Sequence, residues 1–208
     1  MSRGINAVIF DIGNVLIEWQ PERYFDRLIG AARRKALFGA VDLHAMMDRI
    51  DAGGVFGDVV EQTARAHPDW ASEIRHFRDH WTELAQPVIA HSVRLLNALK
   101  DCGVPVFALS NFGAQNFPLS RAQFPFLNQF DRHYISGEMG LIKPDPAIYA
   151  AVEADCALPP QSLLFTDDRA DNIAAAAARG WQVHLFDGAP GFAQTLVTAG
   201  LLTQEQAR

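Results

Sequence analysis

The sequence predicts an α/β fold in which a doubly wound parallel sheet carries an inserted all-helical segment. Short apolar segments alternate along the chain with helical patterns, and several of these segments are apolar throughout. One long stretch after the first apolar segment contains helical patterns alone. Alternation of this kind indicates a parallel sheet with helices on both faces, and continuous apolar strands are typical of its buried interior.

Five segments are predicted to be strands because they are short and mostly rich in β-branched and aromatic residues. The first, second and fourth are near-continuous apolar runs, as expected of strands that are buried on both faces. The predicted strands are residues 5–10 (INAVIF), 104–110 (VPVFALS), 132–136 (RHYIS), 163–167 (LLFTD) and 181–186 (WQVHLF).

Helical patterns separate these strands. One begins at Pro87 and ends at Gly103, a residue type that commonly follows the last turn of a helix. Two more cover residues 146–156 and 170–180, and the second of these ends at Gly180. These helices are expected to cover the two faces of the sheet.

Residues 20–86 interrupt the alternation. Four segments there place apolar residues at helical spacing, namely ERYFDRLIG, DLHAMMDRIDAG, FGDVVEQTARAH and ASEIRHFRDHWTEL, and none is a convincing strand. Prolines and glycines separate these segments. We therefore expect an all-helical insertion above the carboxyl ends of the strands, where open α/β sheets bind ligands.

The composition is that of a globular protein with one large domain, or with a core and a smaller inserted one. The chain has 208 residues, of which 49% are hydrophobic and 20% are charged. Its net charge is −6, and its only dense basic run, ARRK at 32–35, is expected to be a solvated helix face. We therefore expect no binding to nucleic acid or to a membrane.

Targeting and redox features are also missing from the sequence. No apolar stretch approaches the roughly 20 residues that a membrane helix needs, and the first residues lack the apolar region of a signal peptide. The two cysteines, Cys102 and Cys156, do not form a disulfide framework or a metal-binding motif. A cytoplasmic protein is expected.

Four polar motifs lie at the predicted carboxyl ends of strands or in the loops that follow. Asp11 follows VIF, Ser110 follows VFAL, Lys143 lies in GLIKPD, and Asp167 and Asp168 lie in LLFTDD. Singly, each has an ordinary structural explanation, such as a helix cap or a surface lysine. Together they bring a nucleophile, a hydroxyl donor, a cation and two carboxylates to one edge of the sheet.

These motifs resemble those of the haloacid dehalogenase-like hydrolase superfamily. FDIGNVL, ALSNF, GLIKPDPAIY and FTDDRADNI are similar to its four motifs, and the resemblance covers nearly the whole chain. It implies a Rossmann-like catalytic core of residues 1–19 and 87–208, with residues 20–86 as the helical cap. More narrowly, FDIGNV, LSN and DDRADN are similar to a bacterial branch of sugar-phosphate phosphatases that includes α-glucose-1-phosphate phosphatases.

The resemblance implies a Mg²⁺-dependent phosphomonoester hydrolase whose partner is a small-molecule phosphate ester. Asp11 and Lys143 are the implied catalytic residues, and Asp11 would attack phosphorus to form an aspartyl-phosphate. The phosphate would be held by Lys143, by the hydroxyl of Ser110 and by backbone N–H groups around Gly13 and Asn111. The expected oligomeric state is a monomer or a homodimer.

The same resemblance implies a Mg²⁺ site. Asp11, Asp168 and the main-chain carbonyl of Gly13 are the implied ligands, because Mg²⁺ prefers oxygen and takes one or two carboxylates. Asp167 would lie close by, orienting the catalytic lysine or a metal-bound water. Asn172 either steadies a metal-bound water or is an ordinary polar residue in the first turn of a helix.

Gly13 departs from the pattern of relatives that carry an acid at this position. In them the acid protonates the leaving oxygen and then activates water, which is typically worth ~10²- to 10⁴-fold in rate. The side chain of Asn14 cannot replace this acid, because it has no proton with a suitable pKa. We expect either water relayed from a nearby group such as Glu18, or a leaving group that needs little help, as in a hexose 1-phosphate.

The insertion is expected to select the substrate. For the aromatic candidates, core packing is the alternative explanation. The candidates near the site by sequence are Glu18, Trp19, His44, Arg49, Asp51, Trp81 and Phe112, of which Glu18 and Arg49 are the strongest.

Two other functions stay open. In a 2-haloacid dehalogenase, Asp11 would displace halide, and Gly13 favours this function because halide leaves without a proton. Asp167 and Asp168 count against it, since two further negative charges would oppose a carboxylate substrate. A non-catalytic module that binds a phosphorylated ligand is the second alternative, although the nucleophile, the lysine and the acidic pair are all retained.

Overall fold

The fold, described here for residues 4–208 of a computed structural model, is built on one parallel sheet. Its strand order is β5-β4-β1-β6-β7. All five predicted strands are confirmed, each within two residues of its predicted ends. They are β1 (Ala7–Phe10), β4 (Val106–Ser110), β5 (Arg132–Ile135), β6 (Leu163–Asp167) and β7 (Gln182–Leu185).

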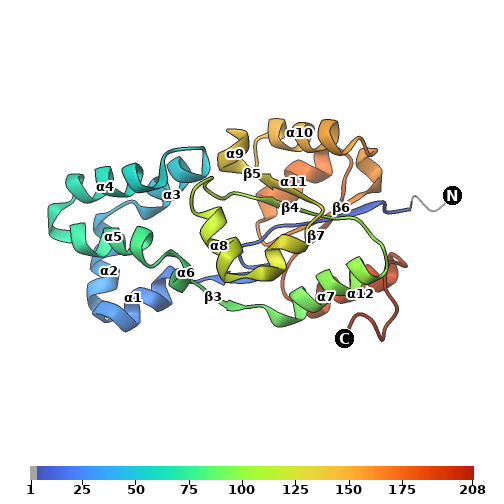
Figure 1. The fold of residues 1–208 in the computed structure, drawn as a ribbon, viewed down its shortest axis with the longest axis horizontal. Helices are drawn as coiled ribbons and strands as arrows, with labels where there is room; N and C mark the ends of the chain where they lie inside the picture. The colour runs from blue at the N-terminus through green and yellow to red at the C-terminus, as the bar shows by residue number, and fades with distance from the viewer. Residues whose placement is uncertain (1–3) are drawn as a thin grey trace.

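Helices cover both faces of this sheet, as the alternating pattern predicted (Figure 1). Val8 and Phe10 of β1 pack into a core with apolar residues of α7 (Ala90–Asp101) and α12 (Ala189–Thr198). Ala7 and Ile9 point to the opposite face, where they pack with α10 (Pro146–Cys156) and α11 (Ala170–Ala178). The central strand is therefore buried on both sides.

Two shorter helices complete this part of the molecule, and the second of them, like α12, was not predicted from the sequence. They are α8 (Phe117–Gln123), which follows β4, and α9 (Ser136–Met139), which follows β5 directly. Because α8 begins only at Phe117, neither Ser110 nor Asn111 caps it.

Residues 21–84, called here the helical insertion, form a helical layer at the carboxyl ends of the strands (Figure 1). Their apolar side chains form a separate core that includes Phe25, Phe77 and Trp81. The helices are α1 (Pro21–Ile29), α2 (Ala31–Ala40), α3 (Leu43–Asp51), α4 (Phe56–Ala66), α5 (Ala71–Asp79) and α6 (Trp81–Leu84), with a 3₁₀ turn at Pro68–Trp70.

The two ends of the helical insertion pair with each other. β2 (Ile17–Trp19) and β3 (Ala85–Val88) form an antiparallel two-stranded sheet. The prediction that residues 20–86 lack a strand is therefore wrong at Ala85, and the helix predicted from Pro87 begins at Ala90. Such short strands form only because the fold brings them together, so their sequences carry little local signal.

Within residues 4–208, every helix is too short or too polar to cross a lipid bilayer.

Candidate active site

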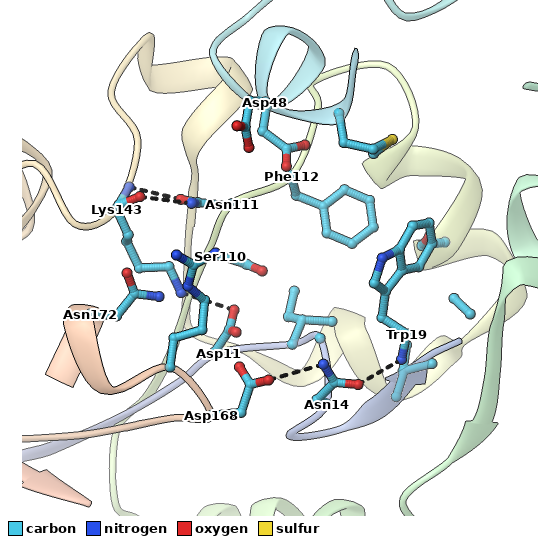
Figure 2. A pocket seen from close by; sticks show the side chains of 18 of the residues that line it. Asp11, Asn14, Trp19, Asp48, Ser110, Asn111, Phe112, Lys143, Asp168 and Asn172 are labelled. Carbon is cyan, nitrogen blue, oxygen red and sulfur yellow. Dashed lines mark hydrogen bonds and ion pairs between the residues drawn. The ribbon is translucent and has the colours of Figure 1, made fainter. Parts of the chain in front are cut away.

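The polar motifs meet in a cavity of about 260 Å³ between the sheet and the helical insertion. Figure 2 shows Asp11 and Asp168 on one side of this cavity, with Asp48 of the insertion and Phe112 across from them. Asp11 follows β1 directly, and its backbone N–H donates to the carbonyl of Thr166 in β6 (2.9 Å). The polar residues that follow adjacent parallel strands therefore lie close together at the same edge of the sheet.

Lys143 is the buried cation of this cluster. Its Nζ lies 3.0 Å from Oδ1 of Asp11 and 2.6 Å from Oδ2 of Asp167, and it also donates to the carbonyl of Leu109 (2.9 Å). Burial alone would lower the pKa of Lys143, but the charges of Asp11 and Asp167 outweigh burial and raise it. The ammonium group therefore stays charged beside Asp11.

Asp11 is also buried, and its pKa is raised to about 6. Burial is the main cause, and the negative charges of Asp167 and Asp168 add to it. Lys143 and a hydrogen bond from Ser110 act in the opposite direction and favour the carboxylate. The carboxylate is thus poorly solvated and held near a cation, which suits a nucleophile that attacks an electrophilic phosphorus.

Asn111 fixes the backbone of the loop that carries Lys143. Its Nδ2 donates to the carbonyl of Lys143 (2.9 Å), and its Oδ1 accepts from the backbone N–H of Lys143 (2.8 Å) (Figure 2). Since both ends of the amide are used in this way, the side chain of Asn111 positions Lys143. A contact to a ligand from Asn111 would come from its backbone.

Asp167 is fully buried and has partners at both oxygens. Lys143 donates to Oδ2, the backbone N–H of Arg169 donates to Oδ1 (2.8 Å), and Nδ2 of Asn172 lies 3.0 Å from each oxygen. Asn172 belongs to the first turn of α11 and lines the cavity. Its side-chain amide therefore holds Asp167 in position behind the cavity.

Asn14 joins Asp168 to the start of the helical insertion. Its Nδ2 donates to Oδ2 of Asp168 (3.0 Å), while its Oδ1 accepts from the backbone N–H of Trp19 (2.9 Å) (Figure 2). Asn14 has a φ of 54°, in the left-handed region that asparagine tolerates better than most residues. This role of Asn14 was not predictable from the sequence, because its two partners are set by the fold.

The carboxylates form a group that fits a hard divalent cation. Asp11, Asp167 and Asp168 each offer an oxygen, and these oxygens lie within 4.8 Å of one another. Oδ1 of Asp11 is buried without a well-directed hydrogen bond, although Lys143 is close. The Gly13 carbonyl accepts none of the backbone hydrogen bonds of its loop, so it too is free to bind a cation.

The helical insertion and the strand that leads into it supply the opposite wall of the cavity. Of the seven residues proposed for substrate selection, five line the cavity: Trp19, His44, Asp51 and Trp81 on this wall, and Phe112 from the loop that follows β4. Glu18 and Arg49, the two strongest sequence candidates, do not line it. Instead, Glu18 pairs with Arg23 (2.9 Å), and Arg49 donates to Gln62 (2.7 Å). Asp48 and Met47 line the wall without having been predicted.

Aromatic rings make up much of this wall. The rings of Trp19 and Trp81 lie 5.0 Å apart, and those of Trp81 and Phe112 lie 5.5 Å apart. Nε1 of Trp81 donates to Ser120 (2.9 Å), so this indole is satisfied and buried. Trp19 and Phe112 are only partly buried and present apolar surface to a ligand.

Comparison with known proteins gives one family match and several relatives. The model of the haloacid dehalogenase-like hydrolase family matches residues 5–180. A sesquiterpene phosphatase of Aspergillus oryzae is 27% identical over 189 residues, which are 90% of this chain and 93% of that protein.

Solved structures share the fold. A haloacid dehalogenase family enzyme from Bacteroides thetaiotaomicron, in complex with magnesium and inorganic phosphate, is similar with a TM-score of 0.67 and 22% identity. The match covers 89% of this chain and 96% of that one. The L-2-haloacid dehalogenase of Xanthobacter autotrophicus is similar with a TM-score of 0.62 and 19% identity, over 98% and 86% of the two chains.

Proposed function

Because the chain belongs to the haloacid dehalogenase-like hydrolase family, we propose that it is a Mg²⁺-dependent phosphomonoester hydrolase. The observation that carries this proposal is the meeting of Asp11, Lys143 and Asp168 in one cavity. A nucleophile, a buried cation and a carboxylate for a metal are the parts that phosphoryl transfer requires. The sesquiterpene phosphatase, and the similar enzyme bound to magnesium and phosphate, support the same activity.

In this proposal Asp11 attacks phosphorus and forms an aspartyl-phosphate, which water then hydrolyses. Lys143 offsets negative charge on the phosphate and on Asp11, and the hydroxyl of Ser110 donates to a phosphate oxygen. Backbone N–H groups near Gly13 and Asn111 complete the phosphate site.

Asp11, Asp168 and the carbonyl of Gly13 would hold Mg²⁺. When bound, the ion would supply positive charge between the carboxylates and the phosphate. Asp167, also expected near the metal, has hydrogen-bond or ion-pair partners at both oxygens, so we assign it the task of orienting Lys143.

We further propose that two parts of the chain have separate roles. Residues 1–19 and 87–208 would act as the catalytic core, and residues 20–86 would act as a cap that selects the substrate. The support is that Asp11, Ser110, Lys143 and Asp168 all come from the core, while residues of the insertion, among them His44, Met47 and Trp81, line the cavity across from them.

A small sugar phosphate such as a hexose 1-phosphate is the narrower substrate proposal. An anomeric hydroxyl is more acidic than an ordinary alcohol, so it leaves more readily from a site with no acid at Gly13. Trp19 and Phe112 offer aromatic surfaces for a sugar ring, and His44 offers a polar group.

The same aromatic wall also suits the phosphate of an apolar alcohol. This second candidate class is favoured by Trp19, Met47 and Phe112, which expose apolar surface toward the cavity, and by the similarity to a sesquiterpene phosphatase.

The direct test is a phosphate-release screen with Mg²⁺, including hexose phosphates, nucleotides, amino-acid phosphates and isoprenoid monophosphates. The screen should be repeated with EDTA and paired with a chloride-release assay on 2-chloropropionate. Phosphate release that EDTA abolishes is expected. Chloride release that EDTA leaves unchanged would contradict the proposal and favour a dehalogenase.

Replacing Asp168 with alanine is expected to abolish activation by Mg²⁺, because it removes one of only two carboxylates that would bind the ion directly. The measurement is phosphate release against Mg²⁺ concentration. If Asp168→Ala kept the wild-type Mg²⁺ dependence, the second carboxylate ligand would have to be Asp167.

Replacing Asn14 with glycine is expected to weaken Mg²⁺ binding by about 10- to 100-fold, as is typical when a hydrogen-bond partner of a metal ligand is lost. Glycine tolerates the positive φ at this position, so the variant removes the bond to Asp168 without straining the backbone. The Mg²⁺ concentration for half-maximal activity reports the effect. An unchanged value would show that Asn14 does not position Asp168.

A further inference from the structure

We propose that Asp51, from the helical insertion, is the general acid and base of the reaction, the role for which Gly13 supplies no side chain. The inference rests on the proposed phosphomonoester hydrolase function. It assigns the missing proton donor to a residue that is distant in sequence from the nucleophile but shares its cavity.

The space next to Gly13 is open. A Cβ atom built at Gly13 would meet no heavy atom within 4 Å, so no neighbouring side chain fills the place of an acid there. Glu18, the nearby group that the sequence suggested as a relay, pairs with Arg23 and does not line the cavity. A side chain that donates a proton to the leaving oxygen would therefore come from another element.

Four carboxylates line the cavity, and two of them, Asp11 and Asp168, already have roles. Of the other two, Asp48 is exposed to solvent, whereas Asp51 is partly buried at the end of α3. Burial of Asp51 disfavours the charged form of its side chain.

The surroundings of Asp51 supply a second, independent observation. Burial is the main cause that raises its pKa, to about 7, and the negative charges of Asp48 and Asp11 add to it against the opposing charge of Lys143. No hydrogen bond to the Asp51 carboxylate from residues 4–208 contributes to this balance. A carboxyl group in this condition can both hold and release a proton near neutral pH.

The backbone at Asp51 is fixed to the catalytic core. The hydroxyl of Ser136, at the start of α9, donates to the carbonyl of Asp51 (2.6 Å) and accepts from the backbone N–H of Phe112 (2.9 Å). A Cβ at Gly113 would lie only 2.5 Å from the side chain of Ile50, so α3 packs directly on the loop that follows β4. Asp51 is thus held in place relative to Ser110 and the phosphate site.

The proposed chemistry uses the carboxyl group of Asp51 twice, first as an acid and then as a base. As Asp11 forms its bond to phosphorus, the bond from phosphorus to the alcohol oxygen breaks, and protonated Asp51 gives its proton to that oxygen. Carboxylate Asp51 then takes a proton from water as the water oxygen attacks the aspartyl-phosphate. The bond between phosphorus and Asp11 breaks, phosphate leaves, and Asp51 is protonated again.

The test compares Asp51→Asn with the wild-type protein on two esters, an alkyl phosphate and p-nitrophenyl phosphate, both with Mg²⁺. For the alkyl ester, kcat/KM is expected to fall by about 100-fold or more, because its leaving oxygen needs a proton. For p-nitrophenyl phosphate, whose leaving group needs none, kcat/KM should change by less than about threefold. Its kcat should fall, and a burst of nitrophenol should appear, because water attack has lost its base.

Asp48→Asn is the matched comparison, since it removes a carboxylate from the same helix and the same cavity. It is expected to change the ratio of the two kcat/KM values far less than Asp51→Asn does, because Asp48 acts on Asp51 only through its charge. A similar fall for both esters in Asp51→Asn, no fall for either, or an ester-selective fall in Asp48→Asn instead would overturn the proposal.

Two controls distinguish these outcomes from loss of the fold and from failure of the proposed function. Circular dichroism and thermal melting check the fold of Asp51→Asn, and Asp51→Ser should give the same ester-selective loss if the asparagine variant does not fold. A wild-type protein that releases no phosphate from any ester would instead contradict the proposed function itself.

Discussion

Replacement of Asp11 by asparagine is expected to lower phosphate release by about 10⁴-fold or more while leaving the fold intact. The amide has the shape of the carboxylate but cannot attack phosphorus. Burial disfavours the charged form of Asp11, and Lys143 would keep Asp167 as its partner, so a neutral side chain of the same shape fits the same place. The measurements are kcat with p-nitrophenyl phosphate and the melting temperature.

Asp101→Asn is a suitable control, because Asp101 is an exposed acid at the end of α7 and lies outside the cavity. It should keep the wild-type rate. If Asp11→Asn also kept a rate near that of the wild type, Asp11 would not be the nucleophile, and the assignment of the whole site would have to change.

Replacement of Lys143 by methionine is expected to lower the free energy of unfolding by about 3–5 kcal/mol and to remove activity. The buried ammonium lies between Asp11 and Asp167, and its loss leaves two buried carboxylates without a cation. Urea denaturation without Mg²⁺ measures the effect. Added Mg²⁺ should restore part of the lost stability, because it supplies positive charge to the same carboxylates.

Lys100→Met provides the matched control. Lys100 also pairs with an aspartate, Asp131, but both side chains are substantially exposed, so the loss should stay below about 1 kcal/mol. A loss of similar size in Lys143→Met would show that the buried pair contributes no more than a surface one. The argument for a charge-balanced cluster would then fail.

The five strands were predictable because their signal is local. Strands such as β1 and β6 carry apolar residues on both faces, and this pattern can be recognised without knowing which strand pairs with which. The strands β2 and β3 were not predictable, because each is short and forms only through pairing with the other end of the helical insertion. Helices of the insertion were predicted where apolar spacing is regular, whereas α2, of which only Leu37 is buried, was indicated only by the basic run at 32–35.

Some residues of the candidate site could likewise be predicted from the sequence, and others could not. Asp11, Ser110, Lys143 and Asp168 were identifiable because motif residues at strand ends or in the loops beyond them converge in any parallel sheet of this kind. The residues that would select the substrate could not be identified in this way. Glu18 and Arg49 were preferred, yet each pairs with a neighbour outside the cavity.

The fold class, the order of the strands along the chain and the charged motifs at one edge of the sheet could be predicted without a structure. They follow from hydrophobic periodicity and from residue types that stand next to predicted strand ends. Three features became visible only in the folded molecule: Asn14 bonds to Asp168, Asn172 holds Asp167, and Asp51 lines the cavity of Asp11. Asn14 and Asp168 are 154 residues apart in the chain, and contacts at such separations depend on how helices and strands pack rather than on any local pattern.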